Sequence, residues 1–209
     1  GELLLSAIDP FVLGNKGSAL IHEMLHNLGA RFNGRPRHIP AALDRNGTVV
    51  HALLSGTYAG GSMDEVMARD YLAGRYWGAM DSNEEGFWNF ETMNLKGEQK
   101  DCAVYLSFWL FSPRSLVNLL LEPNMPRLDL EFAVDDKLAV YVNSNLLDNA
   151  IKRQDNPALP QRIEGIPLEK GWNHVLLKVG QLWGGWNGRF RFTATDPAYM
   201  RQLESVIMQ

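Results

Sequence analysis

Residues 171–179, Gly-Trp-Asn-His-Val-Leu-Leu-Lys-Val, decide the fold, because branched apolar residues take every second position at the end of this run. Successive side chains of a strand point to opposite faces, so the alternation predicts a strand with one buried face. A loop follows at 184–188, Gly-Gly-Trp-Asn-Gly, where glycine allows backbone angles that other residues avoid. Residues 189–193, Arg-Phe-Arg-Phe-Thr, then alternate again. The two runs predict neighbouring strands, as a hairpin or at a sandwich corner.

Two earlier runs extend this pattern. Residues 103–111, Ala-Val-Tyr-Leu-Ser-Phe-Trp-Leu-Phe, are apolar on both faces, which predicts a central strand. Residues 128–134, Leu-Asp-Leu-Glu-Phe-Ala-Val, alternate with acids, which predicts a strand with one wet face. Another strand is expected at 137–143, after the pair Asp135-Asp136. The chain is therefore predicted to be mainly β.

Taken together, these runs resemble the galactose-binding-like jelly roll, an ancillary module of many bacterial glycoside hydrolases. The resemblance covers roughly residues 48–196 and rests on Gly171-Trp172-Asn173, on the Ser112-Pro113 strand end, and on the Asp-Asp turn before a strand that ends in Asn143. It implies a jelly-roll β-sandwich, a carbohydrate partner and a neighbouring catalytic domain in the same polypeptide. It also implies a periplasmic or extracellular location.

The segments outside that region are expected to be short appendages. Residues 1–34 predict one strand and one helix, similar to the remnant of a preceding domain. Residues 35–47 are rich in proline, glycine and polar groups, which predicts a linker. Residues 197–209 predict a short C-terminal helix, with Tyr199 among the residues that face inward.

Composition excludes several classes of function. The 209 residues are 45% hydrophobic and 21% charged, enough to bury one substantial core. The net charge of −4 and the absence of a basic block argue against a nucleic-acid partner. A single cysteine, Cys102, excludes an intrachain disulfide framework. The apolar runs are too short to span a bilayer, so no membrane partner is expected.

The sequence His22-Glu23-Met24-Leu25-His26 matches the His-Glu-x-x-His motif of zinc peptidases. There two histidines one helical turn apart ligate zinc and the glutamate acts as the base. Phe32 stands where the metzincin form has its third ligand, and only 21 residues precede His22. Surface histidines are therefore the favoured interpretation, and a zinc metallopeptidase is the alternative. The candidates for a third zinc ligand are Asp64 and Glu65.

A ligand site is predicted among aromatic and polar residues in irregular segments, because sugar CH faces stack on aromatic rings while amides, carboxylates and arginine bind hydroxyls. The candidates are Trp77, Glu85, Trp88, Asn89, Trp183, Trp186 and Arg189. The competing interpretation is that the tryptophans close the end of the sandwich. Trp109 and Trp172 are expected to pack in the protein, and Trp183 and Trp186 to be exposed on the glycine-rich loop.

The adjacent pair Asp135 and Asp136 has two interpretations, a solvated turn or part of a structural calcium site. Adjacent carboxylates diverge on a strand or turn, so they are unsuited to an acid–base pair. No other cofactor is expected, and no nucleophile elbow or phosphate-binding loop is present. The predicted function is a non-catalytic carbohydrate-binding or structural ancillary domain of a larger glycoside hydrolase.

Overall fold

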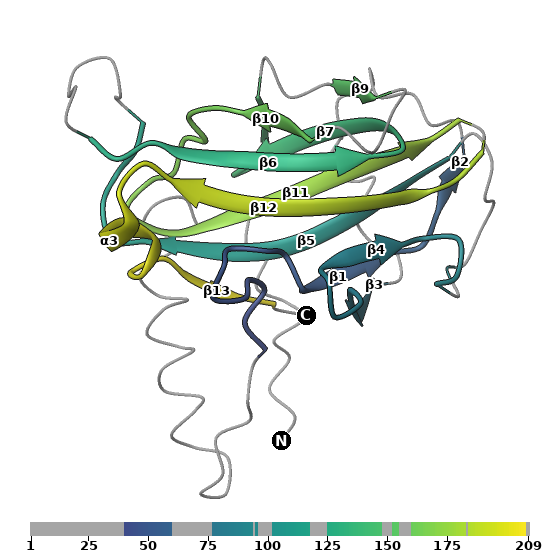
Figure 1. Cartoon of the computed structure of the whole chain (residues 1–209), viewed down its shortest axis with the longest axis horizontal. Coiled ribbons are helices and arrows are strands. Elements are labelled where there is room, and N and C mark those ends of the chain that lie inside the picture. Colours follow the sequence, from purple (N-terminus) through teal and green to yellow (C-terminus); the bar gives the residue numbers. More distant parts are fainter. Residues whose placement is uncertain are drawn as a thin grey trace, which may run out of the picture.

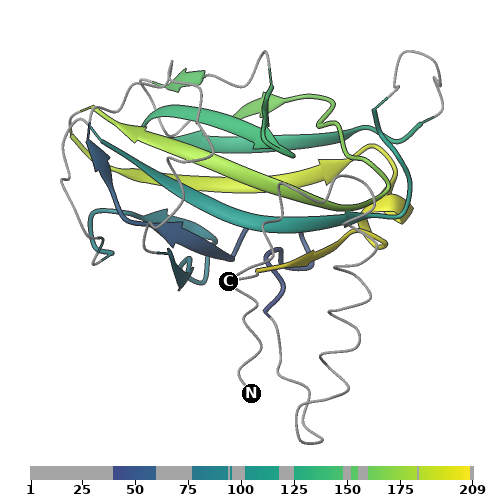
Figure 2. The same ribbon diagram turned by 180° about the vertical axis from the view of Figure 1, so that it is seen from behind.

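The protein is described by a computed structural model at residues 40–59, 77–93, 95, 102–117, 125–147, 152–154, 160–182 and 184–207. These residues form two antiparallel sheets that enclose one core as a β-sandwich (Figure 1). Figure 2 shows the same two layers from behind. The predicted mainly β class is confirmed, and the jelly-roll assignment stays a prediction. The predicted strand and helix of residues 1–34 lie outside the described ranges.

The larger sheet has nine strands among the described residues. Its main path is β3 (Trp77–Asp81), β1 (His51–Ser55), β5 (Cys102–Ser112), β11 (Gly171–Gln181), β7 (Asp136–Val142) and β8 (Asn145–Leu146). Three short strands pair beside this path: β2 (Tyr58–Ala59) and β13 (Glu204–Val206) with β5, and β9 (Lys152–Gln154) with β7. β5 is central, as its two apolar faces predict.

The smaller sheet follows the order β10 (Gln161–Ile163), β6 (Leu128–Val134), β12 (Asn187–Ala194) and β4 (Phe87–Asn89). Its strands have one buried and one outward face. In β12, Phe190 and Phe192 are fully buried, whereas Arg189 and Arg191 are exposed. The alternation in the sequence therefore predicts correctly which face of this sheet meets the core.

The core lies between the sheets. Leu177 and Val179 of β11 stand opposite Leu106 and Val104 of β5, and all four are buried. Phe108 meets the ring of Phe192 from the other sheet edge-on, with the ring centroids 6.0 Å apart. Burying one such apolar side chain contributes about 1.5–3 kcal/mol to the stability of the folded state.

An asparagine pair fixes the corner where β11 begins. The fully buried Asn173 amide donates to the carbonyl oxygens of Glu169 (2.8 Å) and Gly171 (2.9 Å). Its Oδ1 accepts from the Glu169 N–H (2.8 Å) and from Asn143 Nδ2 (2.9 Å). Asn143, at φ 50°, accepts the His174 N–H at 2.9 Å. Two of the asparagines that carry the jelly-roll resemblance therefore have structural roles.

The outer face of the larger sheet is also largely buried and carries an apolar cluster. Tyr105, Ala139, Tyr141 and Leu176 form a second apolar cluster there, each at most 3% exposed. Trp109 and Trp172, 8% and 7% exposed, lie on the same face, so their predicted packing is confirmed.

Two predicted boundaries differ from the structure. Residues 40–47 do not form a free linker, because Ala42 is fully buried and the Leu43 N–H donates to Ser205 Oγ at 2.8 Å. The tail after Asp196 forms one turn of helix, α3 (Pro197–Met200), which buries Tyr199 as predicted. It then forms β13, because the edge of β5 at residues 109–111 offers backbone groups for pairing.

Candidate ligand-binding surface

The pairing of β4 with β12 decides which side chains reach the outer face of the smaller sheet. Trp88 stands opposite Gly188, and both are buried. A Cβ on Gly188 would lie 2.8 Å from the Phe190 ring, so a larger residue there would disturb the core. The neighbouring pairs, Phe87 opposite Arg189 and Asn89 opposite Asn187, therefore face outward. The Cβ atoms of such directly opposed residues lie about 5 Å apart.

β6 completes this outward area. Ala133 stands opposite Arg189, and the Asp135 N–H donates to the Asn187 carbonyl oxygen at 3.0 Å. We call these outward residues the β4–β12 surface. It consists of Phe87, Asn89, Ala133, Asp135, Asn187 and Arg189. Arg189 is exposed and the other five are partly exposed. The surface thus combines one aromatic ring, two amides, one carboxyl group and one guanidinium.

Gly185 leaves space beside two of these groups. A Cβ on Gly185 would lie 2.8 Å from Asp135 Oδ2 and 3.6 Å from Asn187 Nδ2. The carboxyl group and the amide therefore both border the position where this glycine lacks a side chain. Burial raises the pKa of Asp135 above its ordinary value, and the nearby carboxylates of Asp136 and Glu91 raise it further.

A tight turn holds β4 in place. Asn83 Oδ1 accepts the N–H groups of Glu85 (3.0 Å) and Phe87 (2.8 Å). Gly86 has φ 76°, and a Cβ there would lie 2.3 Å from Thr48 Cγ2, so both the backbone angle and the space require glycine. The turn thus fixes the position of Phe87, and it leaves the Glu85 side chain exposed.

One polar atom of the β4–β12 surface has no hydrogen-bond donor among the described residues. This atom is Asn89 Oδ1, which is buried. A buried carbonyl oxygen without a partner costs about 1–3 kcal/mol, which a water that donates to it would offset.

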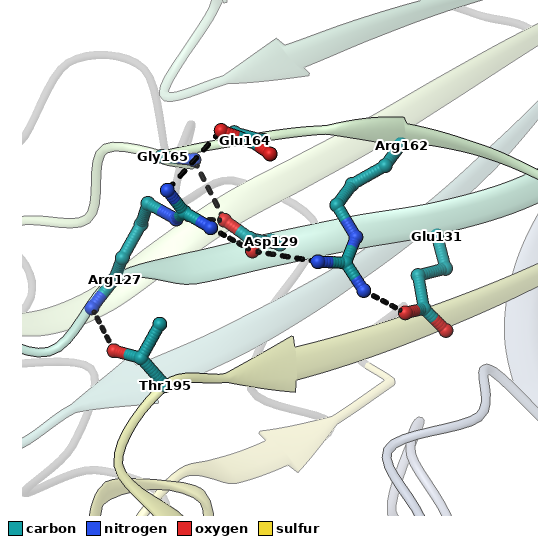
Figure 3. A network of polar contacts seen from close by, with 7 residues as sticks. All are labelled: Arg127, Asp129, Glu131, Arg162, Glu164, Gly165 and Thr195. Atoms are coloured by element: carbon teal, nitrogen blue, oxygen red, sulfur yellow. Dashed lines mark hydrogen bonds and ion pairs between the residues drawn. The ribbon is translucent and has the colours of Figure 1, made fainter.

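The other half of the same sheet face is an ion-pair network (Figure 3). Asp129, with its side chain 3% exposed, lies 2.9 Å from Arg127 Nε as an ion pair, and it accepts hydrogen bonds from Arg127 Nη2 at 3.1 Å and from the Gly165 N–H at 3.0 Å. Arg127 also pairs with Glu164 at 3.1 Å. Arg162 contacts Asp129 at 3.7 Å and pairs closely with Glu131. Two arginines therefore pair with three carboxylates, so each guanidinium on this half of the face already has an acidic partner.

The predicted ligand residues are divided between core and surface. Asn89 and Arg189 lie on the β4–β12 surface, and Glu85 lies in the preceding turn. Trp88 and Trp186 are 0% and 1% exposed and pack on either side of Phe90, with ring centroids 6.4 and 5.4 Å from it.

The expectation that Trp186 is exposed is therefore wrong. Its indole packs inward, because the Phe90 N–H binds the Trp186 carbonyl oxygen at 3.0 Å and holds the loop against the core. Trp77 lies on β3 of the larger sheet, away from the β4–β12 surface. Trp183 lies outside the described ranges.

The sequence patterns do not select Phe87, Asp135 or Asn187 as ligand residues. The available signal was alternation through residues 87–89, which places Phe87 and Asn89 on the face opposite to Trp88. A strand of three residues is too short to fix which face is buried without its partner strand.

The metal-ligand candidates lie mostly outside the described ranges. His22, Glu23 and His26 of the zinc motif are outside them, as are Asp64 and Glu65. Asp136 Oδ2 accepts the Leu182 N–H at 2.6 Å, so this carboxylate helps to hold the start of the glycine-rich loop. Within the part of the chain that is described, no three His, Cys, Asp or Glu side chains gather to hold a metal ion. The described helices include none with the length and hydropathy of a membrane span.

Comparisons with known proteins give distant structural likenesses. No family model and no curated protein matches the sequence. The β-glucosidase from Kluyveromyces marxianus is 13% identical over 72% of this chain and 16% of its own, with a TM-score of 0.36. The GH2 β-galacturonidase from Eisenbergiella tayi is 11% identical over 67% of this chain and 23% of its own, with a TM-score of 0.39.

A family 35 carbohydrate-binding module from an environmental isolate is 16% identical over 56% of this chain and 83% of its own, with a TM-score of 0.31. This chain matches less than a quarter of the length of the two enzymes. Likenesses at these TM-scores do not assign the chain to a family.

Proposed function

We propose that this chain is a non-catalytic carbohydrate-binding module and that glycan lies across the β4–β12 surface. One observation carries the proposal: the register of β4, β12 and β6 places an aromatic ring, two amides, a carboxyl group and a guanidinium together on one outward face. These are the groups that sugars require, since a ring supports CH stacking and the polar groups exchange hydrogen bonds with hydroxyls.

Each residue has a defined part in this proposal. The Phe87 ring supports a sugar ring from below. Asn187 Nδ2 and the Asp135 carboxyl group, which border Gly185, bind hydroxyls at one end of that ring.

The expected affinity is modest, because the surface is open. One aromatic contact and three or four hydrogen bonds contribute roughly 4–6 kcal/mol, which corresponds to a Kd of roughly 0.05–1 mM. Such a module is effective when it is tethered, since it raises the local concentration of glycan near a neighbouring domain. The jelly-roll resemblance extends the proposal to a glycoside hydrolase as that neighbour and to a location outside the cytoplasm.

Affinity electrophoresis on gels that contain polysaccharides tests the proposal. The wild-type chain should be retarded on at least one polysaccharide, and Phe87→Ala should abolish the retardation. Asn187→Ala should weaken binding by about fivefold, the effect of one hydrogen bond. Asn145→Ala, which removes an exposed amide at the start of β8 in the larger sheet, serves as the matched control and should bind as the wild type does.

Thermal unfolding of each variant shows whether it is folded. A wild-type chain that is retarded on none of a broad set of polysaccharides would overturn the proposal. The second interpretation of the sequence would then apply, in which the domain braces a neighbouring domain without binding sugar.

A further inference from the structure

We infer that the glycan carries carboxylate groups and that Arg189 of the β4–β12 surface binds one of them. This inference rests on the proposed function and names the chemical class of its ligand. The observation behind it is the difference between Arg189 and the other arginines on the same sheet face.

Arg127 and Arg162 have acidic partners, which are Asp129, Glu131 and Glu164. Arg191 stands opposite Glu131, and its Nε donates to the Asn46 carbonyl oxygen at 3.1 Å. Arg189 is exposed, and neither a hydrogen bond nor an ion pair joins its side chain to any other described residue. Its cross-strand neighbours, Ala133 and Phe87, carry no charge.

The carboxylates of this face do not reach Arg189 from their present positions. Glu131 and Asp129 lie two and four positions along β6 from Ala133, and Arg162 and Arg127 hold them. Glu164, just after β10, pairs with Arg127. Asp135 lies beyond Asn187, against Gly185, and forms no ion pair with Arg189. The guanidinium therefore presents its donors to solvent.

A guanidinium offers two parallel N–H groups that match the two oxygens of a carboxylate. Directly opposed residues in a sheet have Cβ atoms about 5 Å apart, so a sugar ring stacked on Phe87 can direct its carboxylate to Arg189. Ala133, on the other side of Arg189, is small and leaves room beside the guanidinium. These positions suit a uronic acid residue.

Long-range electrostatic attraction would not account for binding of an acidic glycan. The chain carries a net charge of −4, so its long-range field repels a polyanion. Selective retention of an acidic glycan would therefore require a local contact. That contact should weaken when salt rises from about 0.05 to 0.5 M, because exposed charge pairs are screened.

The test uses polygalacturonate and the same polymer with its carboxyl groups methyl-esterified, so that the two probes differ mainly in charge. The full chain should bind the acidic form about tenfold more tightly than the ester, as expected for one charge-assisted pair. Arg189→Gln should remove the preference for the acidic form, so that the ratio of the two affinities falls from about tenfold to about one. Arg189→Lys should fall between these values, since a lysine keeps the charge but loses the two-pronged geometry.

Arg191→Gln is the matched control, because it removes a charge from the same strand and face. It should change the preference for the acidic form by less than about threefold. Equal binding of the acid and the ester, or full acid preference in Arg189→Gln, would overturn the inference while glycan binding itself stands. Binding of no polysaccharide at all would overturn the proposed function and this inference together.

Discussion

The outer faces of the two sheets differ in composition and burial. On the larger sheet the outward residues of β5 and β11 are mostly buried: Tyr105 and Leu176 are 1% and 3% exposed, and even the polar Ser107 and Lys178 are 8% and 4% exposed. On the smaller sheet the outward residues of β12 are polar, and Arg189 and Arg191 are exposed. The inner faces of both sheets pack on one shared apolar core.

From this difference we expect the outer face of the larger sheet to contribute to stability and the outer face of the smaller sheet to contribute to ligand binding. A face whose side chains are already buried contributes apolar burial to folding, and changes there are expected to affect the free energy of unfolding. A face with exposed, partly unpaired polar groups contributes little to folding and is available to a ligand. The predictions below test this contrast, from the largest expected effect to the smallest.

A charge on each face should give the largest contrast. Leu176→Asp places a carboxylate in the buried outer cluster of the larger sheet and should destabilise the protein by at least about 3 kcal/mol, because a buried charge loses its hydration. Ala133→Asp, on the outer face of the smaller sheet and opposite Arg189, should change stability by less than about 1 kcal/mol. Urea unfolding followed by circular dichroism measures both, and equal losses would contradict the contrast.

Asp129 is expected to be the exception on the polar face. Asp129→Ala removes the buried carboxylate that Arg127, Arg162 and the Gly165 N–H share, and should cost about 2–4 kcal/mol, since their donors lose a partner. Glu164→Ala removes a carboxylate that is 58% exposed and should cost less than about 1 kcal/mol. Chemical unfolding distinguishes the two, and a loss for Glu164→Ala as large as for Asp129→Ala would contradict the network.

His174 should make the larger sheet sensitive to acid. Burial lowers the pKa of His174 from 6.5 to about 4. Between these values the unfolded chain binds a proton that the folded chain does not, so stability falls as pH drops from 6.5 to 4, by about 1–3 kcal/mol from this group.

The variant His174→Gln isolates this contribution from that of the carboxylates. Gln retains a donor for Ser107 Oγ, which lies 2.8 Å from His174 Nε2. Unfolding free energies measured from pH 7 to 4 should fall less steeply in the variant. If the unfolding free energies of variant and wild type fell equally steeply with pH, protonation of His174 would not be a cause of the loss of stability in acid.

The smallest effect concerns two tyrosine hydroxyls. Tyr141 OH, on the outer face of the larger sheet, is buried and has no hydrogen-bond partner among the described residues, so Tyr141→Phe should stabilise the protein by up to about 1 kcal/mol. Tyr199 OH shares a hydrogen bond with Ser112 Oγ at 2.6 Å, so Tyr199→Phe should destabilise the protein by about 1 kcal/mol. Differential scanning calorimetry should show melting temperatures that shift in opposite directions, and shifts of the same sign would contradict these assignments.

The strands were predictable where the sequence pattern was long. The double apolar face of β5 and the alternation of β12 each extend over eight or more residues, enough to identify the buried face without a partner. β4 has three residues, and its phase depends on Gly188 of β12, about a hundred positions away in the chain. For this reason the sequence favoured Trp88 as a ligand residue, while the structure turns Phe87 outward.

The sequence by itself determined that this chain has antiparallel strands and which faces of the long strands are apolar, because side-chain alternation is a local property of the backbone. Tertiary structure decided which outward residues meet. Phe87 lies on β4, Arg189 on β12 and Asp135 at the bend after β6, and their grouping depends on the hydrogen-bonded register between those three strands. Register arises when all strands pack on one core at once, so a pattern within any single strand does not encode it.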